Sequence, residues 1–211
     1  MLSPMQKDVL TELVNVYIGQ AANLLSEMVN QKVNLSVPEV ELISVNDEID
    51  LFHYSSVFSP GHIISSSLKF GQSFQGKALL VFPLHEAKLI VAACLGEDLS
   101  GPVAEDDYEL LDTDFDVLRE ISNVILNAVI GEFGNLLDTK LEYSLPEIEL
   151  VYVSENEQKE LLGSDIYNLV LHTSFMLAEA RVNGVILVVL SMNSVTWLLR
   201  QIDQILEDMD G

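Results

Sequence analysis

The chain has 211 residues, of which 33 are acidic and 10 basic, so its formal net charge at pH 7 is −23. Nucleic-acid backbones and anionic membrane surfaces would repel such a chain, and we expect neither as a partner. Hydrophobic residues make up 49% of the sequence, enough for a full core. No export signal or bilayer-length apolar run is evident, and the single cysteine cannot form an internal disulfide, so we expect a cytoplasmic protein without membrane insertion.

The first predicted element is a long amphipathic helix over residues 4–30, because apolar side chains recur there at helical intervals. Ser3 can cap its start, and the proline that follows suits the first helical position. Asp8, Glu12 and Asn15 are spaced by four and three residues. They therefore form one polar stripe on the opposite face of this helix.

The remainder of the first half alternates strand and turn signals. A strand is predicted over 33–45, and Pro38 within it indicates an edge position, a bulge or a break into two pieces. Strands at 62–70 and 77–82 are expected to be joined by a turn, and a shorter apolar helix is predicted over 84–95. The acidic segment 96–107 is expected to be an exposed connection to the second half.

The second half repeats this order of elements. We expect a helix from about 106 to 137, strands at 141–153, 166–178 and 185–190, a turn near Asn183 and Gly184, and a helix over 194–209. The polar stripe recurs as well, at a constant offset of 108 positions. The corresponding residues are Asp8 and Asp116, Glu12 and Glu120, Asn15 and Asn123, and Pro38 and Pro146.

The two halves are expected to share one core, because each has only one strongly apolar sheet face and amphipathic helices. The prediction is an α/β (α+β) fold in which a β-sheet packs with two long signature helices. Residues 1–211 would form a single pseudo-two-fold-symmetric domain from an internal duplication. Repeat 1 would cover about 1–100 and repeat 2 about 109–211.

A duplicated solvated helix face would explain the repeated stripe without any function. Other exposed helix positions differ between the halves, however: Gln20 corresponds to Ala128, and Glu27 to Asn135. The retained Asp, Glu and Asn therefore favour a functional site. A carboxylate and a carboxamide three residues apart on a helix can meet one target together.

The spacing Asp-x3-Glu-x2-Asn-x22-Pro, present twice, resembles the signature of the CheC/CheX/FliY phosphatases of bacterial chemotaxis. The resemblance covers the whole chain, and the two intact copies are similar to the CheC-like type. It implies a hydrolase of two-component signalling, a protein aspartyl-phosphate phosphatase. Its substrate would be the phospho-aspartate on the receiver domain of a CheY-like response regulator, with CheD as a further candidate partner.

The resemblance implies that Glu12, Asn15, Glu120 and Asn123 are catalytic. An acyl phosphate already hydrolyses unaided, so the catalyst needs only to hold a water molecule in line with the phosphorus atom. An asparagine carboxamide can do so without placing negative charge beside the phosphoryl group, and a glutamate can pair with a lysine of the partner. No cofactor is expected in this chain, since Mg²⁺ would come with the response regulator.

Three further residues are expected to contact the partner or support the site: Asp8, Asp116 and Asn127. An acidic residue is favourable near a helix start, and Asn127 extends the second polar stripe. Tyr17 is bulky and would crowd the first copy if it pointed outward. We therefore expect the second copy to be the more active one.

The alternative is a non-catalytic adaptor or flagellar-switch-like module that binds a response regulator or CheD. A small-molecule binding domain is a third reading, although no positive feature of the sequence supports it. The histidines show no metal-ligand spacing, so no metal site is expected.

Overall fold

The computed structural model describes residues 2–44, 59–97, 110–154, 167–177 and 180–210. The described helices and strands follow one another in a similar order in the two halves of the chain, except that the second half has one strand more. The elements are α1 (Pro4–Val29), β1 (Val33–Ser44), β2 (Gly61–Gly71), β3 (Gly76–Pro83), α3 (Leu84–Leu95), α4 (Asp112–Leu136), β4 (Glu142–Tyr143), β5 (Glu147–Val153), β6 (Tyr167–Leu177), β7 (Ala180–Leu190) and α6 (Met192–Asp210).

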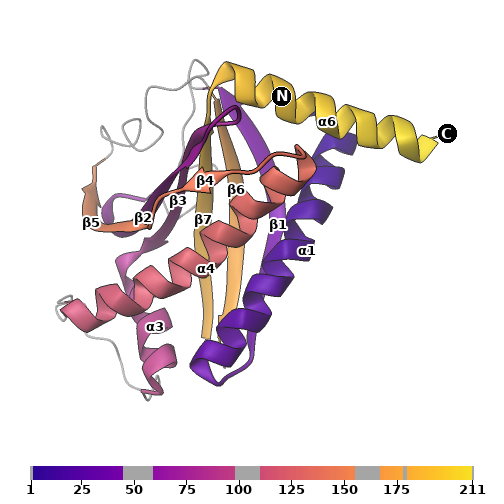
Figure 1. The fold of residues 1–211 in the computed structure, drawn as a ribbon. Coiled ribbons are helices and arrows are strands. Elements are labelled where there is room, and N and C mark those ends of the chain that lie inside the picture. Colours follow the sequence, from indigo (N-terminus) through magenta and orange to yellow (C-terminus); the bar gives the residue numbers. More distant parts are fainter. Residues whose placement is uncertain (1, 45–58, 98–109, 155–166, 178–179, 211) are drawn as a thin grey trace.

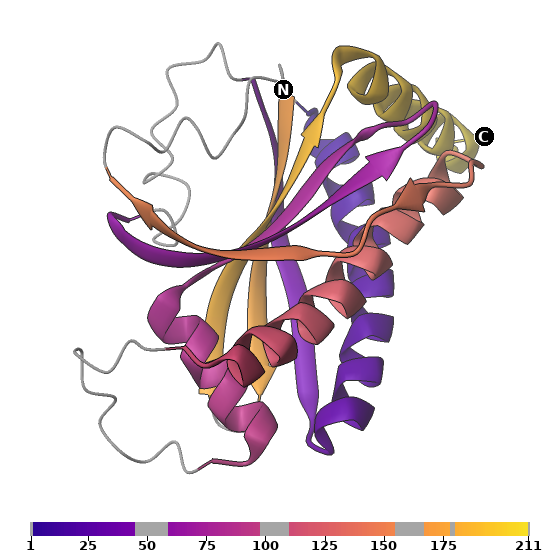
Figure 2. The same ribbon diagram turned by 60° about the vertical axis from the view of Figure 1, so that its left-hand side comes forward.

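These strands form one seven-stranded antiparallel sheet in the order β1-β6-β7-β3-β2-β4, with β5 also paired to β2. Helices α1 and α4 lie side by side across one face of the sheet (Figure 1). Helix α3 packs near one end of α4, and α6 crosses the opposite end of the sheet (Figure 2). The architecture is therefore a mixed α+β fold in which two long helices cover an antiparallel sheet.

The main core lies between the helices and the sheet. It includes Leu10 and Ile18 of α1, Ile125 and Phe133 of α4, and Leu80 of β3, all of them buried. A smaller apolar cluster lies on the other side of the central strands. The expectation of a single apolar sheet face is therefore wrong for these strands, which are apolar on both faces.

Helix α1 begins as predicted. The Ser3 hydroxyl accepts a hydrogen bond from the Gln6 N–H, and the Gln6 side chain accepts one from the Ser3 N–H, which completes a capping box.

Among the helices of the described residues, none is long and apolar enough to cross a membrane.

Of the three possibilities predicted for Pro38, the structure shows two, an edge position and a bulge. Strand β1 is at an edge of the sheet, and its pairing with β6 shifts between Ser36 and Glu39. Val37 and Pro38 together lie opposite the single residue Thr173. An extra residue in one strand leaves backbone groups without ladder partners, so this position needs hydrogen bonds from elsewhere.

The second half differs from the prediction at its first helix and first strand. Helix α4 begins at Asp112, where the Asp114 carboxylate accepts the Leu111 N–H; positions 98–109, which include the start expected at 106, lie outside the described residues. The strand expected over 141–153 is divided into β4 and β5 by residues 144–146. The pairing with β2 shifts by one residue there, so that Leu145 and Pro146 lie opposite the single residue Leu68, as Val37 and Pro38 lie opposite Thr173. The Ser144 N–H still donates to the Lys69 carbonyl.

The turn predicted near Asn183 and Gly184 is wrong, because β7 continues through both residues. Gly184 lies opposite Thr173 in the ladder with β6. A Cβ atom at position 184 would lie 2.5 Å from the ring of the buried Phe82. Glycine is thus required there by close packing against an aromatic ring, and not by a turn.

Candidate functional site

The two predicted sets of site residues occupy matching places on α1 and α4. Asp8 and Glu12 are exposed on α1, and Asp116 and Glu120 are exposed on α4. Asn15 and Asn123 are half-buried in their helices. In both copies, therefore, the carboxylates face solvent while the carboxamide lies partly against the fold.

The Asn15 carboxamide is fully engaged by the backbone. Its Oδ1 accepts the Val37 N–H at 2.7 Å, and its Nδ2 donates to the carbonyls of Val37 at 2.8 Å and Thr11 at 2.9 Å. Val37 is the bulged residue just before Pro38. In this copy the Asn15 side chain thus forms a clasp, in which a side-chain amide satisfies the backbone groups of Val37 that the bulge leaves unpaired.

Asn123 makes a different contact. Its Oδ1 accepts a hydrogen bond of 2.9 Å from Nδ2 of Asn127, one turn further along α4. Leu145, the counterpart of Val37, is 79% exposed, whereas Val37 is 0% exposed. Among the residues that the structure describes, Asn127 is the one hydrogen-bond partner of the Asn123 side chain, so this carboxamide is not clasped to a strand.

The charges around the two motifs leave both glutamates available. Asp116 pairs with Arg119 on the same helix face, and Lys7 pairs with Glu39 at 2.8 Å. That hydrogen bond to Glu39 raises the pKa of Lys7. Within the described parts of the chain, no ion pair involves Glu12 or Glu120, so each can meet a cation supplied by a partner.

Tyr17, which would crowd the first copy if it pointed outward, is directed toward α4. Its hydroxyl accepts a hydrogen bond of 3.3 Å from Asn135 Nδ2 and contacts the carboxylate of Glu132. Glu132 is only 4% exposed, and burial raises its pKa. The sequence analysis missed this cluster, although an acidic residue on the apolar face of a predicted helix was a signal for it.

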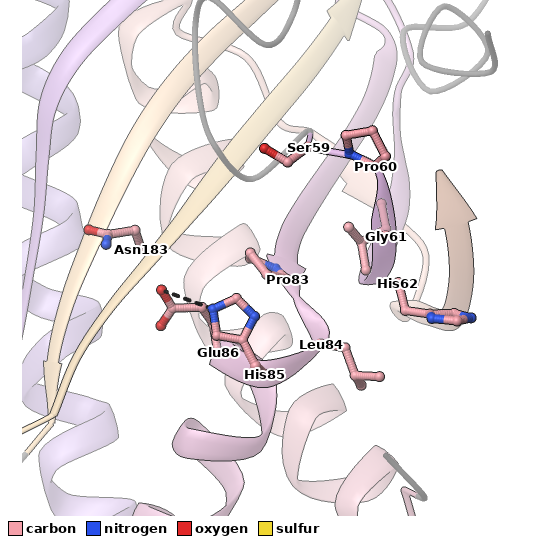
Figure 3. A pocket seen from close by; sticks show the side chains of 10 residues that line it. Ser59, Pro60, Gly61, His62, Pro83, Leu84, His85, Glu86 and Asn183 are labelled. Carbon is pink, nitrogen blue, oxygen red and sulfur yellow. Dashed lines mark ion pairs between the residues drawn. The ribbon is translucent and has the colours of Figure 1, made fainter. Parts of the chain in front are cut away.

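A separate cavity of about 520 Å³ lies where β2 begins and β3 passes into α3 (Figure 3). Burial raises the pKa of Glu86, whose carboxylate pairs with His85 at 3.9 Å and accepts a backbone hydrogen bond from Asn183. The His62 side chain is directed away from Glu86 and packs edge-on against Tyr152. The polar groups of this cavity do not converge on one point.

Metal and thiol chemistry gain no support from the described residues. They contain no group of three or more His, Cys, Asp or Glu side chains that could hold a metal ion. Burial raises the pKa of the Cys94 thiol to about 11. A thiol with so high a pKa is a poor nucleophile near neutral pH.

Sequence comparisons place the chain near known chemotaxis proteins. The model of the CheC-like family matches residues 5–42, which contain the first copy of the motif. The flagellar motor switch phosphatase FliY of Bacillus subtilis (strain 168) is 26% identical over 164 residues, which are 78% of this chain and 40% of that protein. The CheY-P phosphatase CheC of the same organism is 23% identical over 150 residues, 69% of this chain and 66% of that protein. The chain thus spans less than two thirds of the length of either relative.

Solved structures share the fold. Thermotoga maritima FliY superimposes with a TM-score of 0.75 at 18% identity, covering 97% of this chain and 98% of that one. The FliM middle domain of H. pylori gives a TM-score of 0.62 at 10% identity, covering 95% and 99%. At such low identity these likenesses concern the architecture alone.

Proposed function

We propose that this chain is a phosphatase of the CheC-like type that accelerates hydrolysis of the phospho-aspartate on a CheY-like response regulator; the family match over residues 5–42 and the similarity to FliY and CheC support this proposal. The observation that carries the proposal is the second copy of the motif on α4. There an exposed Glu120 and a carboxamide not clasped to a strand, that of Asn123, lie three residues apart on one helix. The named activities of FliY and CheC support the same reaction class.

In the proposed mechanism Glu120 pairs with a lysine beside the partner's phosphorylated aspartate and places α4 against the partner's active site. Asn123 then hydrogen-bonds a water molecule and holds it in line with the phosphorus atom. A carboxamide is suited to this task because it is neutral and repels neither the water nor the phosphoryl oxygens. The Mg²⁺ belongs to the receiver domain, and this chain supplies no cofactor.

The first copy is proposed to contribute mainly to binding. Glu12 is exposed and can anchor a partner, whereas the carboxamide of Asn15 is already engaged with Val37. Asp8 and Asp116 are proposed to contact the partner or support the helix starts, and Asn127 to support Asn123.

We also propose that the chain arose by an internal duplication, as in CheC-type proteins. The order α1-β1-β2-β3-α3 recurs as α4-β4-β5-β6-β7-α6, with the strand after the long helix divided in the second half. We propose a single domain over residues 1–211 made of two such repeats. A cytoplasmic location, with a receiver domain and CheD as partners, belongs to this proposal.

A non-catalytic switch module is the second candidate, because the FliM middle domain has the same architecture and the fold alone does not distinguish the two functions. Such a module would bind a response regulator or a flagellar component without hydrolysing the phosphoryl group. The two candidates differ in one measurable respect, which is the release of inorganic phosphate.

The test is phosphate release from acyl-phosphorylated CheY-like receiver domains with Mg²⁺, with and without this protein. We expect the protein to stimulate release, and we expect Asn123→Ala to reduce the stimulation by about 10²-fold. Asn23→Ala is the matched control, since Asn23 is an exposed asparagine on α1 outside the motif. Unchanged stimulation by a double Asn15→Ala and Asn123→Ala variant would exclude the mechanism, and binding without stimulated release would favour the switch module.

A further inference from the structure

The two copies of the motif differ in what holds the asparagine carboxamide, and we infer that Asn127 is the positioning residue that keeps the second copy open. It does so by occupying Asn123 Oδ1, the counterpart of the atom that clasps the strand in the first copy. The catalytic consequence of this inference rests on the proposed function, whereas its structural consequence does not.

The first copy shows the closed arrangement. Asn15 Oδ1 accepts the Val37 N–H, so the carboxamide turns from α1 toward the strand. Four residues after Asn15 stands Gly19, which has no side chain to compete for that oxygen. A Cβ atom at Gly19 would meet no atom within 4 Å, so the space that a competing side chain needs is present but unused.

The second copy shows the open arrangement. Asn127 is the counterpart of Gly19, 108 positions later. Its Nδ2 donates to Asn123 Oδ1 at 2.9 Å, which holds the carboxamide along the axis of α4. The difference between a clasped and an unclasped asparagine therefore coincides with one substitution, glycine to asparagine, at the next helical turn.

The residue before the proline differs between the copies in its exposure. Both strands have a one-residue bulge at the proline, but Val37 is completely buried, whereas Leu145 is 79% exposed. If Asn123 held Leu145 as Asn15 holds Val37, the strand would lie against α4. The exposed Leu145 is what an unclasped copy should show.

The hydrogen bonding of the Asn127 side chain supports a role in positioning Asn123. The Asn127 Oδ1 is buried and has no hydrogen-bond partner among the described residues. A buried acceptor without a partner is destabilising and is uncommon in folded proteins. Its presence one turn from Asn123 is consistent with a residue retained for the site and not for stability.

Reciprocal substitutions test the inference in the full-length protein. Asn127→Ala removes the competing donor, and Gly19→Asn introduces one in the first copy. Gly131→Ala is the matched control, because a Cβ atom at this α4 position also meets no atom within 4 Å. Amide hydrogen exchange at Leu145 and Val37 reports on the two clasps without any phosphatase activity.

In Asn127→Ala we expect protection of the Leu145 amide to rise at least about tenfold, as Asn123 takes up the strand. We expect Gly19→Asn to lower protection of the Val37 amide by a similar factor. With a phosphorylated receiver domain as substrate, Asn127→Ala should lower kcat about tenfold and leave KM unchanged, because ground-state binding through Glu120 is untouched.

Unchanged exchange at Leu145 in Asn127→Ala and at Val37 in Gly19→Asn would overturn the inference, whatever the activity. If the exchange changes occur but the wild-type protein stimulates no phosphate release, the proposed function fails while the role of Asn127 stands. A fall in kcat accompanied by equal changes in the Gly131→Ala control would also contradict a specific role for Asn127.

Discussion

Leu79 lies directly opposite Leu187 in the central antiparallel pair of β3 and β7, and these two residues are themselves 108 positions apart. Two flanking pairs are Lys77 with Val189 and Val81 with Val185. Adding 108 to the β3 residue of either pair gives the β7 residue of the other pair. A two-fold axis passing between the two leucines would therefore exchange the strands, which is the register that the proposed duplication requires.

Asn15→Ala should destabilise the fold more than Asn123→Ala does. The first change removes three hydrogen bonds and leaves the backbone of the buried Val37 without partners, which costs about 1–3 kcal/mol. The second removes one bond between two side chains. Urea denaturation of both variants measures the difference, and equal midpoints would show that the Asn15 clasp contributes nothing to stability.

Gly184→Ala should destabilise the protein by about 1–3 kcal/mol, because its methyl group would overlap the ring of Phe82 in a fully packed core. Gly131→Ala serves as the control. Position 131 is open and lies inside α4, so that change is expected to stabilise by about 0.4–1 kcal/mol. Thermal unfolding of the two variants should shift the melting temperature in opposite directions.

Glu132→Gln should stabilise the protein at high pH. Burial raises the pKa of Glu132 in the folded state, so the wild type loses stability as pH rises from the ordinary glutamate value through the raised one. Glutamine is neutral throughout and avoids this loss, while its carbonyl can still accept from Asn135. Urea midpoints at about pH 5 and about pH 8 should show a larger gain for the variant at the higher pH. A gain that does not grow with pH would mean that the carboxylate is not penalised by burial.

Alkylation of Cys94 should be slow in the folded protein. With a pKa of about 11, about one thiol in a thousand is ionised at pH 8. The rate of reaction with iodoacetamide should rise about tenfold per pH unit up to that value. The same protein in concentrated urea is the control, and equally fast reaction of the folded and unfolded forms would contradict the raised pKa.

Local signals in the sequence were sufficient for most elements. Ser3 with the following proline predicted the start of α1, and Pro38 predicted an edge position, a bulge or a break in its strand, because both act through the backbone of their own neighbourhood. Gly184 was misread as part of a turn. The reason for that glycine is the ring of Phe82, which lies 102 positions earlier in the chain and is brought near by strand pairing.

At the candidate site, too, local features could be predicted from the sequence, whereas contacts between distant segments could not. Spacing was enough to place Glu120 and Asn123 on one helix, since helical periodicity is a local property. It could not show that Asn15 is engaged by Val37 while Asn123 is engaged by Asn127, because those contacts depend on how a strand lies against each helix. Tyr17 likewise could not be oriented before the position of α4 relative to α1 was known.

The bulge of β1 also bears on whether this edge of the sheet can pair with another chain. An exposed edge strand offers unpaired N–H and C=O groups to another chain, and a regular edge can extend into an intermolecular sheet. Here Pro38 interrupts the edge, the Asn15 carboxamide occupies the backbone groups of Val37, and the ion pair of Lys7 with Glu39 adds charges beside them. Loss of the Asn15 side chain would therefore have a second effect besides lower stability. It would expose unpaired backbone groups at the edge of the sheet and promote aggregation through strand addition.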